Sequence, residues 1–273
     1  MTDTFATING YDLRYRLRGE GPLVVFGHGL LGSIEQIDAN QASLDDLQRR
    51  VRLLVYDARG HGQSGGPDES AHYTWETLGL DMCSLVEFAG EESAILGGGS
   101  MGAATALWAA IERPRYVRAL VLVMPPPLGF EPMRGAGEKQ ALQVLELVAA
   151  AVQNFGLEKT IELARNFPGF AATPEEADER ASWLLAQNPR ALLHAIRGLI
   201  QAPFHDPECY RQIRVPTLVI AHEGDGLHPM RAAQLLQDTV PDCRIVVGPH
   251  PNYWRTHPED FLAEIDKFLD RVL

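Results

Sequence analysis

The sequence is poor in features that hold metals or build a disulfide framework. Its three cysteines, Cys83, Cys209 and Cys243, are odd in number and widely spaced, which is typical of reduced thiols. No C-x-x-C or H-E-x-x-H spacing occurs. Because zinc and redox sites of the common types need such spacings, we expect no metal and no other cofactor.

Long apolar runs and clusters of basic side chains are also missing. No apolar run reaches membrane-spanning length, and the amino-terminal stretch lacks the apolar segment of a secretory signal. With 24 Lys and Arg against 36 Asp and Glu, the net charge is −12, and the one basic stretch is Arg14, Arg16 and Arg18. These absences argue against nucleic acid and membranes as partners. We expect a cytoplasmic protein with a small-molecule substrate, and the sequence leaves its oligomeric state open.

Short apolar runs alternate with helix-length segments, a pattern that indicates parallel strands joined by helical crossovers. The runs are apolar at nearly every residue, as in strands covered on both faces. The expected strands are 23–26, 51–56, 94–96, 119–124, 217–221 and 244–247, and the expected helices are 74–89, 101–112, 230–237 and 258–273. The predicted fold class is α/β, with a mostly parallel central sheet flanked by helices.

The strand rhythm stops in one long segment rich in alanine and leucine. The Pro125 to Pro127 turn opens roughly 80 residues of helical pattern broken by single prolines. We therefore predict a core of residues 1–127 and 208–273, with residues 128–207 inserted as a helical cap.

The pattern G-x-S-x-G occurs twice, around Ser64 and around Ser100. A nucleophile elbow needs a strand directly before the serine and a helix directly after it. Ser100 meets this requirement, whereas Ser64 follows a polar loop and precedes Gly65, Gly66 and Pro67. The glycines around Ser100 also spell the G-x-G-x-x-G of dinucleotide-binding loops, but the strand before them is not the first of the sheet, which weakens that alternative.

Several stretches resemble the α/β-hydrolase fold serine hydrolases of the compact, cap-bearing type, which include esterases, lactonases and carbon–carbon bond hydrolases. They are His28-Gly29, the segment Asp57 to Ser64, the elbow at Ser100, the Asp225 loop and the His250 loop. The likeness covers nearly the whole chain except the insertion, and it makes the Asp57 to Ser64 segment a framework loop.

A serine nucleophile needs a histidine base and an acid that orients it, and in this fold they follow in the order Ser, acid, His. His250, in the turn after the last strand, is the predicted base, and His257 before the closing helix is the alternative. Asp225 is the predicted acid. The family usually has glycine where this chain has His222, and this departure leaves Glu223 as an alternative acid.

The oxyanion hole needs two backbone N–H groups. Met101 supplies one by its position after the nucleophile, and the resemblance assigns the second to Leu30, with Leu31 as the alternative. We predict that apolar cap residues close a substrate pocket together with Trp254. The candidates are Phe155, Phe167, Phe170, Trp183, Phe204 and Trp254.

The expected activity is hydrolysis of a carboxylic ester or lactone of a small, largely apolar substrate, through an acyl-enzyme on Ser100. A carbon–carbon bond hydrolase or an enol-lactonase would use the same residues. A non-catalytic ligand receptor with this fold is the alternative of another class, since fold alone does not fix function.

Overall fold

The computed structural model describes all residues except 1–3, 41–43, 127–134, 167–169, 172 and 252. The described residues form an eight-stranded sheet in the order β1-β2-β4-β3-β5-β6-β7-β8. β1 and β2, and β2 and β4, pair antiparallel, and all other neighbours are parallel. The predicted α/β fold is confirmed. The strands are β1 (Thr4–Ile8), β2 (Tyr11–Arg18), β3 (Leu23–Gly27), β4 (Arg52–Tyr56), β5 (Ala94–Gly99), β6 (Val117–Val123), β7 (Thr217–His222) and β8 (Cys243–Gly248).

The sheet begins with a hairpin that the sequence analysis did not identify. β1 and β2 are joined at Asn9 and Gly10, whose φ angles are 48° and 88°. An Asn-Gly pair with two positive φ angles is the favoured two-residue hairpin turn. The hairpin extends the sheet beyond β4 with two strands that partly face solvent.

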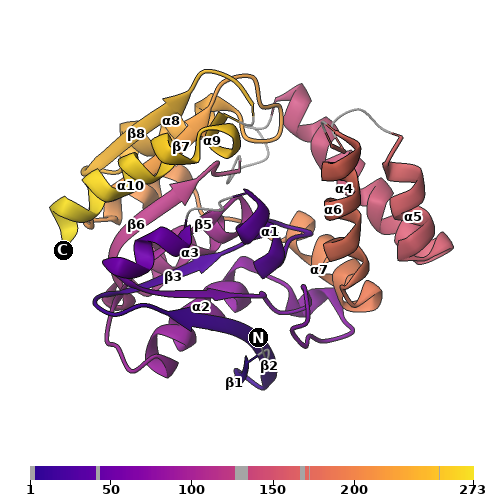
Figure 1. Ribbon diagram of the computed structural model, residues 1–273, viewed down its shortest axis with the longest axis horizontal. Coiled ribbons are helices and arrows are strands. Elements are labelled where there is room, and N and C mark those ends of the chain that lie inside the picture. The colour runs from indigo at the N-terminus through magenta and orange to yellow at the C-terminus, as the bar shows by residue number, and fades with distance from the viewer. Residues whose placement is uncertain (1–3, 41–43, 127–134, 167–169, 172, 252) are drawn as a thin grey trace.

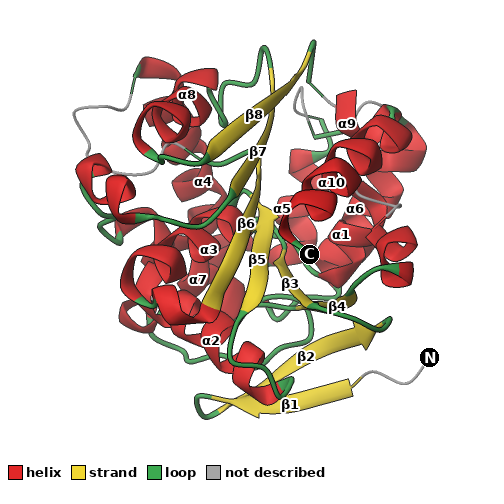
Figure 2. Cartoon of the chain, turned by 90° about the vertical axis from the view of Figure 1, so that its left-hand side faces the viewer, coloured by secondary structure: helices red, strands yellow, loops and turns green. Residues whose placement is uncertain are grey.

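Helices cover both faces of the sheet, as Figure 2 shows. One apolar cluster packs α2 (Trp75–Phe88), α3 (Met101–Glu112) and α8 (Met230–Thr239) on one face. A second cluster packs α1 (Ile34–Asn40), α9 (Tyr253–Thr256) and α10 (Pro258–Val272) on the other. Strands β3 to β7, which lie between the two layers, are buried at nearly every residue, which explains their largely apolar sequences. Four 3₁₀ helices complete the described core at Leu44–Arg49, Ser70–His72, Pro114–Tyr116 and Pro207–Gln212.

The described residues between β6 and β7 form α4 (Ala136–Phe155), α5 (Leu157–Ala164), α6 (Pro174–Leu185) and α7 (Pro189–Gln201). We call these four the inserted helices, and Figure 1 shows them gathered at one side of the molecule. They have an apolar cluster of their own, against which the side chains of Leu30 and Leu31 pack. The buried amide of Gln187 donates to the carbonyl oxygen of Leu31 at 2.7 Å. The inserted helices are therefore anchored to the loop after β3. The predicted domain bounds stay a prediction.

Candidate active site

Ser100 stands at a sharp turn between β5 and α3. Its φ is 49° and its ψ −105°, a region that non-glycine residues rarely occupy. Close packing of the turn against β3 holds it there: a Cβ atom on Gly102 would lie 2.3 Å from the carbonyl oxygen of Gly27, and one on Gly98 would lie 2.5 Å from the same atom. The glycines of the motif therefore let the start of α3 approach β3, and the turn presents the Ser100 hydroxyl to the cavity.

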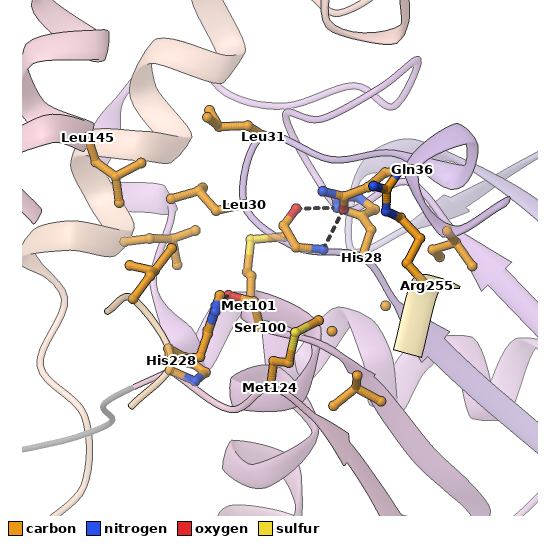
Figure 3. Close-up of a pocket in the computed structure, with 18 of the residues that line it drawn as sticks. His28, Leu30, Leu31, Gln36, Ser100, Met101, Met124, Leu145, His228 and Arg255 are labelled. Carbon is orange, nitrogen blue, oxygen red and sulfur yellow. Dashed lines mark hydrogen bonds between the residues drawn. The ribbon is translucent and has the colours of Figure 1, made fainter. Parts of the chain in front are cut away.

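A histidine from the loop after β7 meets this hydroxyl (Figure 3). His228 Nε2 lies 2.9 Å from Ser100 Oγ, and His228 Nδ1 lies 2.7 Å from Asp225 Oδ2. Because the ionised carboxylate can only accept, Nδ1 carries the proton and donates it to Asp225. Whenever Nε2 is without a proton, its lone pair faces Ser100. The three residues form one continuous hydrogen-bonded chain.

Asp225 is held by its own loop. Its Oδ1 accepts the backbone N–H groups of Leu227 at 2.8 Å and His228 at 3.1 Å. Burial alone would raise the pKa of the Asp225 carboxyl, but the hydrogen bonds and charge of His228, aided by these backbone donors, hold that pKa well below its usual range. Asp225 therefore stays ionised and fixes both the position and the tautomer of His228.

A second histidine approaches the same carboxylate. His222, at the end of β7, is 5% exposed, and its Nε2 lies 3.6 Å from Asp225 Oδ2. The same nitrogen lies 3.0 Å from the sulfur of Met124. His222 occupies the position where the resembled family usually has glycine, so this chain places an imidazole where the family leaves space.

The predicted base, His250, is not brought to Ser100. Its ring is exposed, its Nδ1 lies 2.9 Å from the carbonyl oxygen of Pro251, and its ring packs edge-on against Tyr253. Prolines on both sides of His250 restrict the backbone of this turn, and His250 is not among the residues that line the cavity. The structure corrects the predicted contact: His228 lies against Ser100.

The other two alternatives for acid and base also lie elsewhere. Glu223 is exposed, and its backbone N–H donates to the carbonyl oxygen of Gly248. His257 stacks on Tyr253 before α10. The signal that could have identified His228 was local: Asp225-x-x-His228 places a carboxylate and an imidazole within reach inside one turn, and Asp side chains readily accept the N–H groups of the residues that follow.

The loop after β3 carries the predicted oxyanion donors. Ala58 N–H donates to His28 Nε2 at 2.9 Å, so His28 Nδ1 is protonated and donates to the carbonyl oxygen of Gly29 at 2.8 Å. Burial, with a smaller contribution from His61, lowers the pKa of His28 to about 3 and keeps it neutral. Gly102 N–H donates to the His28 carbonyl oxygen, which ties the loop to the start of α3. His28 is thus a framework residue.

Met101 and Leu30 both line the cavity beside Ser100 (Figure 3). Met101 is the first residue of α3, so its N–H has no partner within the helix. The positive end of the α3 dipole reinforces this position as a place for negative charge. The pair's role as oxyanion donors stays a prediction.

The second serine motif belongs to the framework. Ser64 is 4% exposed, donates to the carbonyl oxygen of Asp57 at 2.7 Å and accepts the N–H of Arg14 at 2.8 Å. Asp57 in turn accepts the N–H groups of Ile34 and Gln63. A hydroxyl engaged on both sides and buried away from the cavity cannot act as a nucleophile.

A cavity of about 450 Å³ opens above Ser100 between the core and the inserted helices. Of the predicted pocket residues, Trp183, Phe204 and Trp254 line it. Phe155 does not: it is 64% exposed at the end of α4, so that prediction is wrong. Phe170 is not among the lining residues and contacts Arg180 instead, and Phe167 lies outside the described residues.

Several lining residues were not predicted from the sequence. The apolar ones include Trp75, Met124, Leu142 and Leu145, and the charged ones include Glu176, Glu179, Arg180 and Arg255. Within the described part of the chain, no group of three or more His, Cys, Asp and Glu residues could hold a metal ion, and no helix combines the length and apolarity that crossing a membrane requires.

Known proteins resemble this chain over almost its full length. The 2-hydroxy-6-oxo-6-(2'-aminophenyl)hexa-2,4-dienoic acid hydrolase of Metapseudomonas resinovorans is 27% identical over 98% of this chain and 91% of that protein. The 2-(acetamidomethylene)succinate hydrolase of Mesorhizobium japonicum is 28% identical over 94% of this chain and 91% of that protein. The crystal structure of a hydrolase from Pseudomonas aeruginosa PA01 superposes with a TM-score of 0.81 at 26% identity and covers 98% of each chain.

A family model described as alpha/beta hydrolase fold matches residues 22–254, which span every strand from β3 to β8 and include Ser100, Asp225 and His228. The resemblance stated from the sequence is confirmed. The chain belongs to the alpha/beta hydrolase family and is an enzyme of that family.

Proposed function

We propose that this enzyme is a serine hydrolase that cleaves a carboxylic ester or lactone through an acyl-enzyme on Ser100, with His228 as the base and Asp225 as its orienting acid. The hydrogen-bonded chain from Asp225 through His228 to Ser100 carries the proposal, because it joins a hydroxyl that lines the cavity, an imidazole and an ionised carboxylate.

In the first half-reaction, Ser100 Oγ attacks the ester carbonyl carbon while its proton passes to His228 Nε2. The carbonyl π electrons move to the oxygen, which becomes an oxyanion. When this intermediate collapses, the bond to the alkoxide breaks and His228 returns the proton to the leaving oxygen. Asp225 stabilises the imidazolium between these two transfers.

In the second half-reaction, water attacks the acyl-enzyme as His228 takes one of its protons. Collapse of the second tetrahedral intermediate breaks the bond to Ser100 Oγ, which regains its proton from His228, and the carboxylic acid leaves. The N–H groups of Met101 and Leu30 are the proposed donors to both oxyanions. Their place beside Ser100, with one at the start of α3, supports this assignment.

Carbon–carbon bond hydrolysis is the second candidate. The relative from Metapseudomonas resinovorans supports it, because that protein is named for hydrolysis of a hexa-2,4-dienoic acid and matches this chain almost end to end. Such a reaction would use the same residues on a ketone carbonyl. A panel of an ester, a lactone and a vinylogous diketone separates the candidates by their relative kcat/KM.

The decisive experiment compares wild type with Ser100→Ala on this panel and with a fluorophosphonate probe. We expect the wild type to be labelled and Ser100→Ala to show neither labelling nor turnover. Ser64→Ala is the control for the other motif. Because Ser64 belongs to the framework, any fall in the labelling of this variant relative to wild type measures a loss of folded enzyme. Turnover by Ser100→Ala would refute the proposal, and an unlabelled, inactive wild type would favour a ligand receptor.

A chain-length series of 4-nitrophenyl esters tests the pocket. The cavity of about 450 Å³ is lined by Trp183, Phe204 and Trp254, so acyl groups longer than acetyl should give a higher kcat/KM. A preference for acetyl would show that the cavity is not the acyl pocket.

A further inference from the structure

Two arginines reach the cavity from different parts of the chain. Arg180 lies on α6 of the inserted helices, and Arg255 lies on α9 of the core, yet both line the same cavity as Ser100. Figure 3 shows Arg255 on the other side of Ser100 from His228. A guanidinium is costly to remove from water, so two of them in a largely apolar cavity call for a physical reason.

Both guanidinium groups have some contacts within the protein. Arg255 Nη2 lies 3.1 Å from Glu176 Oε2. Arg180 donates Nη1 to the carbonyl oxygen of Phe170 at 2.7 Å and lies over the rings of Phe170 and Trp183. Glu179 lines the cavity too, but it is exposed to solvent. Both arginines therefore have described contacts, and Glu176 and Glu179 line the same cavity.

Each guanidinium also keeps an unused donor. The Nε atoms of both Arg180 and Arg255 are buried and have no hydrogen-bond partner among the described residues. A buried donor without a partner costs free energy of folding, typically about 1–3 kcal/mol. Burial also lowers the pKa of Arg180, against the opposing effect of Glu176.

We infer that Arg180 and Arg255 bind a carboxylate of the substrate while its scissile carbonyl lies at Ser100. This inference rests on the proposed function and names its substrate class: esters or lactones of a dicarboxylic acid, hydrolysed at one carboxyl group and held by the other. A carboxylate accepts two hydrogen bonds in the plane of a guanidinium fork. Its oxygens could accept from the Nε donors that Arg180 and Arg255 leave without a partner among the described residues.

The core and the inserted helices both contribute residues to this proposed site. Ser100, His228 and Arg255 come from the core, and Arg180 comes from the inserted helices. A substrate carboxylate between the arginines would therefore bridge the two parts across the cavity. Binding and position of the substrate would then depend on the anion, while bond cleavage would depend on Ser100.

The test compares the neutral ester 4-nitrophenyl butyrate with the mono-4-nitrophenyl esters of succinate, glutarate and adipate, which carry a free carboxylate at increasing distance. For the wild type we expect at least one acid ester to exceed the neutral ester in kcat/KM by about 10- to 100-fold, the range of a charge-assisted hydrogen-bonded pair. Arg180→Gln and Arg255→Gln should each lower that acid-to-neutral ratio by about the same factor, mainly through KM.

Arg165→Gln is the matched control, because Arg165 is an exposed arginine that pairs with Asp178 on the outside of α6. It should leave the ratio unchanged. Binding of the acid esters to Ser100→Ala by calorimetry, with and without Arg255→Gln, gives a readout that needs no turnover, and Arg255→Lys tests whether charge without the planar fork suffices.

The outcomes separate this inference from the proposed function. If wild type hydrolyses the neutral ester through Ser100 but shows no preference for any acid ester, and neither arginine variant changes the ratio, the carboxylate site is refuted and the serine mechanism stands. If Ser100→Ala binds an acid ester in an Arg255-dependent manner but the wild type hydrolyses no ester, the anion site stands and the proposed reaction fails.

Discussion

The loops that follow β7 and β8 leave neighbouring parallel strands at the same edge of the sheet, and each carries a histidine. In the first loop, His228 lies between Asp225 and Ser100. In the second, His250 is exposed and bonded to the carbonyl oxygen of Pro251. The difference teaches that a histidine is placed by the groups that hold its ring, and a strand end alone does not decide where the side chain points.

The largest expected effect on kcat comes from comparing two single variants, in which His228 or His250 is replaced by alanine. His228→Ala removes the proposed base and should lower kcat for a nitrophenyl ester by about 10⁴- to 10⁶-fold, as loss of a triad member does. His250→Ala, the matched control in the second loop, should stay within about twofold of wild type. Steady-state kinetics at saturating ester measures both. The reverse pattern, with His250→Ala inactive, would overturn the assignment of His228.

The acid of the first loop should matter nearly as much. Asp225→Asn keeps the shape of the side chain but cannot hold His228 in the tautomer that accepts the Ser100 proton, so kcat should fall by about 10⁴-fold. Glu223→Gln, two residues away and exposed, is the control and should remain within about twofold. A proton NMR signal from the Nδ1–H of His228 should be present in wild type and His250→Ala and absent in Asp225→Asn.

The fold and the turn that carries Ser100 could be predicted because their signals are local and redundant. A strand, a glycine-flanked serine and a helix in direct succession leave few other conformations for Ser100, and only the context separated it from Ser64. Asp225 was predicted from a local signal too, since it lies in the loop that follows β7. These positions depend on chain neighbours that the sequence shows in order.

The base and the arginines depend on side-chain direction and on contacts between distant elements. Chain order in the resembled family pointed to the loop after β8, and no spacing shows which way the ring of His250 turns. Arg180 on an amphipathic helix has the sequence pattern of a solvent-facing residue, and only the docking of α6 on the core places it in the cavity. The opposite mistake was made at Phe155, which was predicted to line the pocket but is exposed to solvent. Helical periodicity does not say which end of a helix reaches solvent.

A smaller effect is expected at the second neighbour of the acid. His222 Nε2 lies 3.6 Å from Asp225 Oδ2, too far for a hydrogen bond, and its ring also contacts Met124. His222→Gln should therefore lower kcat/KM by about 10-fold or less, through a shift of Asp225. The double variant His222→Gln with His228→Ala should be no slower than His228→Ala alone. A fall in kcat/KM in His222→Gln as large as that in His228→Ala would show that His222 contributes to catalysis as directly as His228 does.

The smallest expected effect concerns stability in acid. Because the folded-state pKa of Asp225 lies below its unfolded value, its stabilising contribution is fully present above the ordinary aspartate pKa of about 4. That contribution is lost as the pH falls through the lowered pKa.

Solvent reaches part of this carboxylate, so we expect wild type to exceed Asp225→Asn in Tm at pH 6 by only about 2–4 °C, the shift that ~1 kcal/mol gives in a chain of this size. The gap should narrow steadily between pH 5 and pH 2, while His250→Ala should follow wild type throughout, since the second loop holds no such pair. A difference in Tm that widens in acid would mean that Asp225 is protonated in the folded enzyme. The pair of Asp225 and His228 would then not stabilise the first loop through charge.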